Sequence, residues 1–283
     1  MEYQNRLPPE GINISRVHPL KQFVQLVFAA IVMIVILVFV LQFTGSLLAK
    51  RIPFSFELAV MERLDIPLGD SVGHPQITRY LNDLADQVMT EMDVPEEIEI
   101  TVHYGSEDVF NAFATVGGNL LFYRDLLIRM PDENTLAMVM AHEISHVLHR
   151  DPIAGLGGGV ASTIALLGLT GNAGTGMAGQ VLTQAGMLTS AQFTRNMEEA
   201  ADEAALSALN GLYGHVNGAT TLFELFSKAR GSKDSTPEWL ENFLSTHPTD
   251  NNRIQAIIAR AASEGWKTDG ELTSLPVQFK SWL

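Results

Sequence analysis

The run His142-Glu143-Ile144-Ser145-His146 lies within an apolar helical pattern. Residues four apart on a helix lie on the same face, one turn apart, so the imidazoles of His142 and His146 can reach one metal ion. Zinc suits them, because neutral imidazole is among its preferred ligands. Glu143 lies beside that ion rather than on it, where a carboxylate can take a proton from an attacking water. The run therefore predicts a helix that carries two zinc ligands and a general base.

The helix around this run should begin near Pro131-Asp132-Glu133 and continue toward Arg150. Proline suits the first helical position, and acidic residues there complement the helix dipole. The apolar neighbours that should bury the helix are Met138, Val139, Ile144 and Val147. Two histidines on a buried face need partners, since unpaired buried polar groups are costly. A surface helix with two solvated histidines is the alternative, and a metal is the simplest partner for the buried pair.

A later acidic run offers candidates for a third ligand. Catalytic zinc takes three protein ligands and keeps one position open, and a chain without cysteine must supply His, Glu or Asp. The run Glu198-Glu199-Ala200-Ala201-Asp202-Glu203 lies on a predicted helix and contains two i,i+4 pairs, Glu198/Asp202 and Glu199/Glu203. One member of a pair could bind the metal while the other accepts a hydrogen bond from a ligand imidazole. Spacing leaves both pairs open, as well as a simple solvated acidic face.

An apolar run near the beginning of the chain predicts a membrane anchor. Residues 23–43, FVQLVFAAIVMIVILVFVLQF, carry no formal charge, and about 20 apolar residues can cross a bilayer as a helix. A cleaved signal has a shorter apolar core of about 7–15 residues, so an uncleaved span is favoured. The expected division is a short N-terminal tail over residues 1–22, one transmembrane helix over 23–43 and one domain over 50–283.

The distribution of charge bears on orientation and on partners. Arg6, Arg16 and Lys21 precede the apolar run, whereas Lys50 and Arg51 follow it. Because positive residues tend to stay in the cytoplasm, this small excess favours a domain on the non-cytoplasmic side, periplasmic or extracellular. The formal net charge is -14, and the 18 Lys and Arg residues form no cluster. We therefore expect a membrane-bound chain with no nucleic-acid partner.

The remaining pattern predicts a mainly helical α+β domain with a small antiparallel sheet. Alternation at Ile98, Ile100 and Val102 is typical of a strand. Two further strands, Val109–Val116 and Leu120–Arg124, should form a hairpin around two glycines. Helical spacing also predicts helices over about 75–92, 192–210, 215–229 and 250–262. Residues 153–190 are uncharged and rich in Gly, Ala, Leu and Thr; they could pack on the domain, enter the membrane surface and return, or form a lid.

These motifs together resemble one known family. HEISH followed about fifty residues later by EEAAD resembles the HtpX-like and CAAX-prenyl-endopeptidase family of membrane-associated zinc metallopeptidases, gluzincins that pair HExxH with an ExxAD glutamate. Three further stretches are similar to family elements: Asn111-Ala112-Phe113-Ala114, His149-Arg150-Asp151, and Ser245-Thr246-His247-Pro248 with Arg253-Ile254. The resemblance covers about residues 75–262 in consistent order, and it implies a zincin-like metallopeptidase fold.

The resemblance also implies particular site residues. Glu198 becomes the third ligand beside His142 and His146, with one Zn²⁺ per chain. Asp202 is implied to support the site beside Glu198 without binding the metal, while Glu199 and Glu203 are implied to be surface residues.

Three further roles follow from the same resemblance. His247 is implied to be a removable extra ligand or a donor to the developing oxyanion, the alternative being a surface histidine in a Thr-His-Pro turn. Arg253 is implied to support the site. Asn111, Ala112, Phe113 and Ala114 should offer a strand edge to an extended substrate.

The expected function is that of a membrane-anchored zinc endopeptidase that hydrolyses peptide bonds in protein or peptide substrates. The resemblance places this activity in quality control of membrane or envelope proteins. HtpX-like members generally have several spans, whereas this chain has one clear span, which favours a single-anchor or soluble branch. The alternative is a membrane-tethered chaperone or assembly factor that keeps zinc for stability. Glu143 argues against that alternative, since structural zinc needs no general base.

Overall fold

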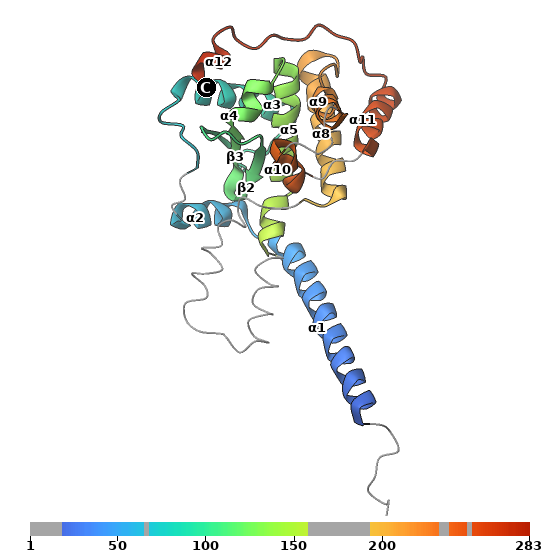
Figure 1. Ribbon diagram of the computed structural model, residues 1–283. Coiled ribbons are helices and arrows are strands. Elements are labelled where there is room, and N and C mark those ends of the chain that lie inside the picture. Colours follow the sequence, from blue (N-terminus) through green and yellow to red (C-terminus); the bar gives the residue numbers. More distant parts are fainter. Residues whose placement is uncertain (1–18, 65–67, 158–192, 232–237, 248–250) are drawn as a thin grey trace, which may run out of the picture.

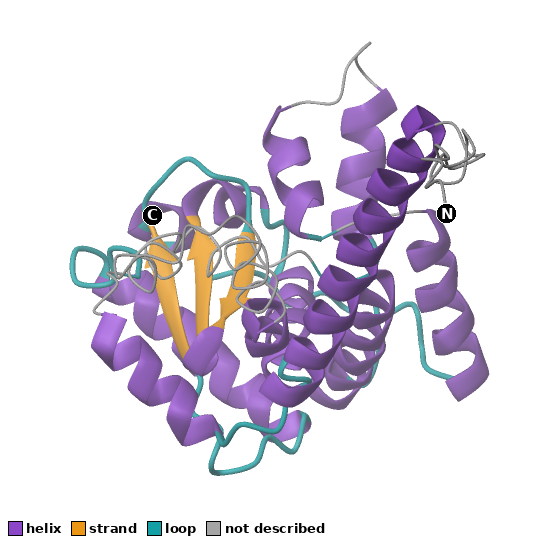
Figure 2. Cartoon of the chain, turned by 90° about the horizontal axis from the view of Figure 1, so that it is seen from below, coloured by secondary structure: helices purple, strands orange, loops and turns teal. Residues whose placement is uncertain are grey.

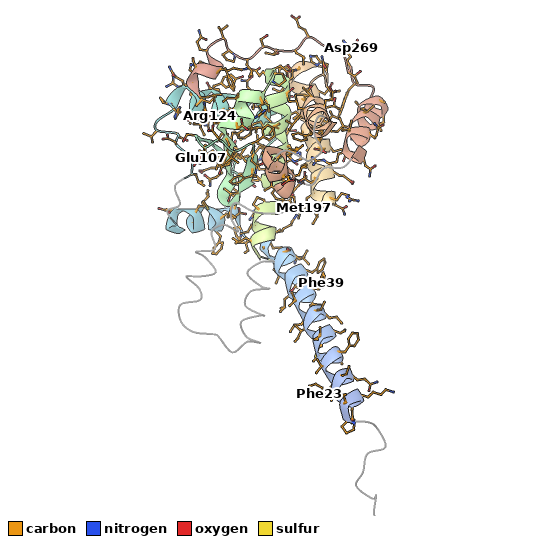
Figure 3. The ribbon with its side chains drawn as sticks, viewed as in Figure 1. Phe23, Phe39, Glu107, Arg124, Met197 and Asp269 are labelled. Atoms are coloured by element: carbon orange, nitrogen blue, oxygen red, sulfur yellow. The ribbon has the colours of Figure 1, made fainter. Side chains whose placement is uncertain are left out.

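The computed structural model describes residues 19–64, 68–157, 193–231, 238–247 and 251–283. One long helix, α1 (Pro19–Ala49), extends away from a mainly helical body (Figure 1). In the described part of the chain, α1 is the one helix long and apolar enough to cross a membrane. Its 31 residues rise about 46 Å, which exceeds a hydrocarbon core of about 30 Å. Phe23 and Phe39 project from it and are largely exposed, as expected for side chains that face lipid (Figure 3).

The body combines a small sheet with helices of very different length. The other helices are α2 (Phe54–Leu64), α3 (Pro75–Glu91), α4 (Arg124–Arg129), α5 (Glu133–Leu148), α8 (Arg195–Tyr213), α9 (Thr221–Gly231), α10 (Glu238–Thr246), α11 (Asn251–Glu264) and α12 (Phe279–Trp282). Residues 151–157 are also helical. The helices predicted from spacing are therefore present as α3, α5, α8, α9 and α11. The short helices α2, α4, α10 and α12 were not predicted.

The sheet contains β1 (Thr101–Gly105), β2 (Ala112–Thr115) and β3 (Asn119–Tyr123) in the order β1-β3-β2 (Figure 2). The predicted hairpin is confirmed, because β2 and β3 pair antiparallel. The prediction of a purely antiparallel sheet is wrong, because β1 pairs parallel to β3. After β1 the chain passes to the opposite edge of the sheet, and β3 then returns into the central position. Alternation in a strand identifies its buried face but not its partner, so the pattern contains no signal for this crossover.

The hairpin turn depends on two glycines. Gly117 and Gly118 have φ angles of 75° and 71°, in the left-handed region that glycine adopts without steric cost. A Cβ on Gly118 would also lie 1.9 Å from the carbonyl oxygen of Glu99. Glycine is therefore required at this position for both space and conformation.

Helix α5 is the central element of the body. Asp132 caps it, because its side chain accepts a hydrogen bond from the Thr135 amide, which confirms the predicted beginning of the helix. Every residue from Asn134 to Val147 is buried, and α5 packs against α3, α8 and β2. A helix buried on all sides must satisfy its polar side chains internally. His142, Glu143 and His146 therefore need partners within the protein.

The insert over residues 153–190 was given three possible placements. Beyond residue 157 it lies outside the described residues. The mainly helical architecture with one small sheet is confirmed.

Candidate metal centre

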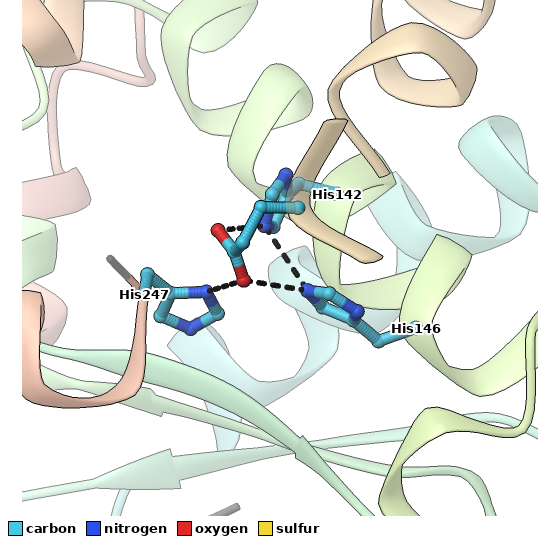
Figure 4. A group of neighbouring side chains, drawn as sticks. His142, His146 and His247 are labelled. Carbon is cyan, nitrogen blue, oxygen red and sulfur yellow. Dashed lines mark hydrogen bonds and ion pairs between the residues drawn. The ribbon is translucent and has the colours of Figure 1, made fainter. Parts of the chain in front are cut away.

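Three elements bring four potential metal ligands together. Helix α5 supplies His142 and His146, α8 supplies Glu198, and the residue after α10 is His247. All four are buried, and their ligand atoms lie within 4.8 Å of one another. Figure 4 shows the three imidazoles arranged around one carboxylate. The structure thus joins the three residues expected as ligands, although Glu198 follows His146 by more than fifty residues.

The carboxylate of Glu198 lies between the two imidazoles of α5. Its Oε1 is 3.4 Å from His146 Nε2, and its Oε2 is 3.5 Å from His142 Nε2. The two Nε2 atoms are themselves 3.2 Å apart. Lone pairs that converge in this way are stabilised by a cation, and two imidazoles with one glutamate are a donor set of catalytic zinc. These residues therefore fit a metal ion.

Carboxylates hold the outer nitrogens of both imidazoles. His142 Nδ1 lies 3.0 Å from Asp202 Oδ1, and His146 Nδ1 lies 3.1 Å from Asp151 Oδ2. Such contacts fix the ring orientation and keep each Nε2 directed at the ligand position. Asp202 is one of the residues that the sequence singled out. The sequence assigned no role to Asp151; the available signal was an acidic residue three positions beyond the end of the helix that carries His146.

Arg253 binds the two carboxylates of α8. Its Nη1 donates to Glu198 Oε2 at 2.6 Å, while Nε and Nη2 donate to the Asp202 carboxylate, each at 2.7 Å. All three side chains are buried. A bidentate guanidinium matches carboxylate geometry, and its charge offsets the cost of burying two anions. Arg253 thus lies where the sequence placed it, around the site.

The buried groups shift one another's protonation. Burial raises the pKa of Glu198, but the charge of His247 and hydrogen bonds from His142 and His146 more than offset it and hold the pKa well below its usual range. Burial lowers the pKa of His142, but Asp202 and Glu198 overcome this and raise it to about 10. The site is therefore anionic enough to retain protons on imidazole, which a bound metal must displace.

Glu143 differs from the other carboxylates of the site. It is fully buried, and among the described residues neither of its oxygens has a hydrogen-bond partner. His247 Nε2 is 3.4 Å from Oε1, close but not in hydrogen-bond geometry. An unpaired buried carboxylate is costly. It is also well suited to accept a proton from a molecule that enters the site.

His247 is buried and contacts two acceptors, so it is not a surface histidine. Its Nδ1 lies 3.1 Å from Glu198 Oε1, and its Nε2 lies 3.2 Å from the carbonyl oxygen of Ala112. Both partners are acceptors, so a ring nitrogen bonds to either of them only by donating. Phe243 stacks on the ring from the preceding helix, with centroids 5.1 Å apart. His247 thereby connects the site to β2.

The predicted substrate strand is partly covered. Asn111 precedes β2, and Ala112, Phe113 and Ala114 lie in it, at one edge of the sheet. All four residues are buried. The Asn111 side chain donates to Thr246 Oγ1 at 3.3 Å, and His247 Nε2 contacts the Ala112 carbonyl oxygen. These two contacts cover part of the strand edge.

Three other polar residues lie outside the cluster. His149 is half-buried and contacts Ser145 at the end of α5. Glu199 and Glu203 are exposed, and Glu203 pairs with Arg260 at 3.2 Å. The pair Glu198/Asp202 is therefore the one that faces the site.

An apolar pocket opens beside His142 and Glu143. Asp202 and Arg253 form part of its polar wall. The large apolar side chains that line it are Met138, Val139, Leu222, Phe223 and Phe243. The pocket therefore places an apolar surface next to the candidate ligands.

A buried helix that carries His-Glu-x-x-His, with a glutamate from a second helix close enough to share a metal ion, is the arrangement typical of a metallopeptidase. The sequence pattern of peptidase family M48 matches residues 75–261, more than half of the chain. The chain belongs to peptidase family M48. The resemblance to membrane-associated zinc metallopeptidases is thereby confirmed at the level of the family.

Several characterised proteins are related to this chain. The β-barrel assembly-enhancing protease of Escherichia coli K12 is 29% identical over 202 residues, which cover 65% of this chain and 38% of that protein. The protein of the same name from Yersinia pestis is 27% identical over 205 residues, 66% of this chain and 39% of that protein. The mitochondrial metalloendopeptidase OMA1 of Schizosaccharomyces pombe is 27% identical over 185 residues, 65% of this chain and 52% of that protein. The match thus spans only about two fifths to one half of these relatives.

Proposed function

We propose that this chain is a membrane-anchored zinc endopeptidase that binds one Zn²⁺ through His142, His146 and Glu198. The observation that carries the proposal is the convergence of these ligand atoms beside Glu143, a buried carboxylate whose oxygens accept no hydrogen bond from the described residues. When bound, zinc supplies a Lewis acid that polarises the scissile carbonyl. Family membership and the donor set both support this assignment.

Glu143 is the general base of the proposed reaction. Its unpaired oxygens can take a proton from the attacking water and return it to the leaving amine. Asp202 and Arg253 hold Glu198 and His142 in place through the hydrogen bonds described above.

The substrate would bind as an extended strand along β2. Backbone pairing requires a substrate N–H to reach the Ala112 carbonyl, which now accepts a hydrogen bond from His247. Substrate binding would therefore displace His247 and would also break the hydrogen bond between His247 and Glu198 Oε1. The described arrangement corresponds in this proposal to a resting enzyme whose substrate position is closed.

The apolar pocket gives the substrate class. A pocket lined by Leu222, Phe223 and Phe243 would bind an apolar side chain next to the scissile bond. Folded proteins bury most large apolar residues, so such segments become available mainly in misfolded or unassembled chains. This supports a role in quality control of membrane or envelope proteins. The E. coli relative is named for β-barrel assembly, which agrees with an envelope role.

The proposed division places the anchor over residues 23–43, within α1, and the peptidase over 50–283. Residues 1–22 would remain in the cytoplasm, with the peptidase on the other side of the membrane. Apolar side chains exposed along α1 support its insertion in lipid.

The decisive experiment uses the full chain purified in detergent. We expect elemental analysis to find one zinc per chain, and we expect the protein to cleave casein in a chelator-sensitive manner. A Glu143→Gln protein prepared in parallel is the control for contaminating proteases. Zinc binding without any cleavage would instead favour the membrane-tethered chaperone or assembly factor.

A further inference from the structure

Asp151 connects the candidate metal centre to the anchor helix. Its Oδ2 lies 3.1 Å from His146 Nδ1, and its Oδ1 accepts a hydrogen bond of 2.8 Å from Lys50 Nζ. Asp151 is 1% exposed, and Lys50 immediately follows α1. A chain of three side chains therefore runs from the end of the anchor to a candidate metal ligand.

The end of α1 is firmly packed on the helical residues 151–157, which meet it in Figure 1. Ser46 Oγ donates to the Ala154 carbonyl at 2.7 Å. Ala49 is buried in a small apolar cluster with Ile153. A Cβ on Gly157 would lie 2.6 Å from the Cβ of Ala49, so the two helices approach as closely as glycine permits. These contacts fix the backbone from which Lys50 reaches Asp151.

A second set of contacts holds the same junction. Arg150 donates to the Ile52 carbonyl at 2.6 Å and forms an ion pair with Glu57. Glu57 in turn accepts a hydrogen bond of 2.9 Å from the Gly117 amide, in the turn between β2 and β3. The segment that follows α1 thus contacts both Arg150, just after α5, and the turn of the hairpin that contains β2.

The chemistry of this arrangement favours a positioning role. A carboxylate on the outer nitrogen of a ligand imidazole fixes the ring and raises its basicity. The ammonium of Lys50, 2.8 Å from Oδ1, balances the charge of this buried carboxylate and holds it in place while Oδ2 faces His146.

We propose that Asp151 is a positioning residue for His146 and that Lys50, at the end of the anchor helix, holds Asp151 in that position. The inference rests on the metal site of the proposed function. It makes the anchor part of the architecture of the site as well as a tether.

The test measures metal affinity in the full chain in detergent. Zn²⁺ affinity is obtained by competition with a chromophoric chelator, and the absorption spectrum of the Co²⁺-loaded protein reports ligand geometry. We expect Asp151→Asn to weaken Zn²⁺ binding by about 10- to 100-fold and to alter the Co²⁺ spectrum. Lys50→Met should weaken binding roughly two- to fivefold, because Lys50 is partly exposed, and Lys50→Arg should restore it.

The double variant tests whether the two residues act in series. If Lys50 acts through Asp151, then Lys50→Met causes no further loss of Zn²⁺ affinity in the Asp151→Asn background. A full additional loss in the double variant would overturn the proposed chain. Lys21→Met, at the opposite end of α1, and Asp108→Asn, in an exposed pair with Arg124, are the matched controls and should bind Zn²⁺ as the parent does.

Two outcomes separate this inference from the proposed function. Wild-type affinity and spectrum in both Asp151→Asn and Lys50→Met would refute the inference, provided that His146→Ala abolishes binding. Full Zn²⁺ binding by His146→Ala would instead refute the metal site itself. Should Asp151→Asn fail to fold, as judged by tryptophan fluorescence on heating, the comparison of Lys50→Met with Lys50→Arg decides the question alone.

Discussion

His247 and Glu198 share a hydrogen bond of 3.1 Å that joins the end of α10 to α8 inside the candidate metal centre. The other oxygen of Glu198 is held by Arg253 at 2.6 Å. The glutamate proposed as third ligand therefore has both oxygens engaged by nitrogen-containing side chains. Of these, Arg253 also binds Asp202, whereas His247 also contacts the Ala112 carbonyl oxygen in β2. His247 is thus the group whose movement would open the site.

The first prediction concerns that movement. His247→Ala removes the contacts with Glu198 and with the Ala112 carbonyl, so substrate no longer competes with them. We expect casein cleavage to rise by up to about tenfold, the equivalent of one net hydrogen bond. His149→Ala is the control, because His149 lies outside the cluster. A lower rate at unchanged zinc content would instead support a role as donor to the developing oxyanion.

A second prediction addresses the ligand set. His146→Ala removes one of the converging nitrogens, and the full chain purified in detergent should then contain little or no zinc by elemental analysis. Again His149→Ala should retain one zinc per chain, although it lies only three residues away. Full zinc content in the His146→Ala protein would contradict the proposed site.

The third prediction separates metal binding from catalysis. Glu143→Gln retains the size of the side chain and touches no proposed ligand atom of the metal. The variant should keep its zinc and unfold at the same or a higher temperature, because a buried charge is removed, while casein cleavage falls by at least about 10²- to 10⁴-fold. Glu199→Gln, on an exposed position, should cleave normally. Near-normal cleavage by Glu143→Gln would move the general base to another residue.

The sequence allowed much of the site to be predicted because the relevant signals are local. Spacing of four residues placed His142 and His146 on one face, and Pro131 with the acidic residues Asp132 and Glu133 marked the beginning of the helix, which Asp132 caps in the structure. Choosing Glu198 over Glu199 needed the family resemblance. The structure gives the physical reason: Glu198 is fully buried and faces α5, whereas Glu199 points to solvent.

What the sequence did not reveal depends on contacts between distant segments. Periodicity reports which face of an element is buried, not what covers it. For this reason the parallel pairing of β1 with β3 was missed. The same holds for Lys50 and Asp151, which are separated by 101 residues and meet only because α1 packs on the helical residues 151–157 that follow α5.

The fourth prediction is a pH dependence of zinc affinity. In the metal-free site the pKa of His142 is about 10, so this imidazole is protonated at neutral pH and zinc must displace the proton. Affinity should therefore rise with pH between about 6 and 8, by about tenfold per unit for each proton released. Titration calorimetry in buffers of different ionisation enthalpy counts the protons directly. A pH-independent affinity without proton release would contradict the expectation.

The raised pKa of His142 also affects the stability of the metal-free protein. A folded pKa above the unfolded value of 6.5 adds stability that is fully present below pH 6.5 and is lost as the pH rises toward about 10. In chelator, the unfolding temperature should fall over that window. With zinc bound, this loss should be absent, because the ligand imidazoles are already neutral.

The last prediction concerns topology. His142 and His146 precede the segment 158–192 and Glu198 follows it, yet their ligand atoms lie within 4.8 Å of one another. That segment must begin and end on the same side of the membrane, so an odd number of crossings within it is impossible.

Reporter tags after residue 172, which is within this segment, and after residue 283 test whether the two positions lie in one compartment. A third tag after residue 5 tests whether the anchor crosses the membrane. If α1 crosses the bilayer, the tags after residues 5 and 283 should lie on opposite faces. We expect the tag after residue 283 to be non-cytoplasmic, since three basic residues precede the apolar run and two closely follow it. Tags after residues 172 and 283 on opposite faces would refute a shared compartment. The same face for both, but in the cytoplasm, would reverse the orientation and leave the metal site intact.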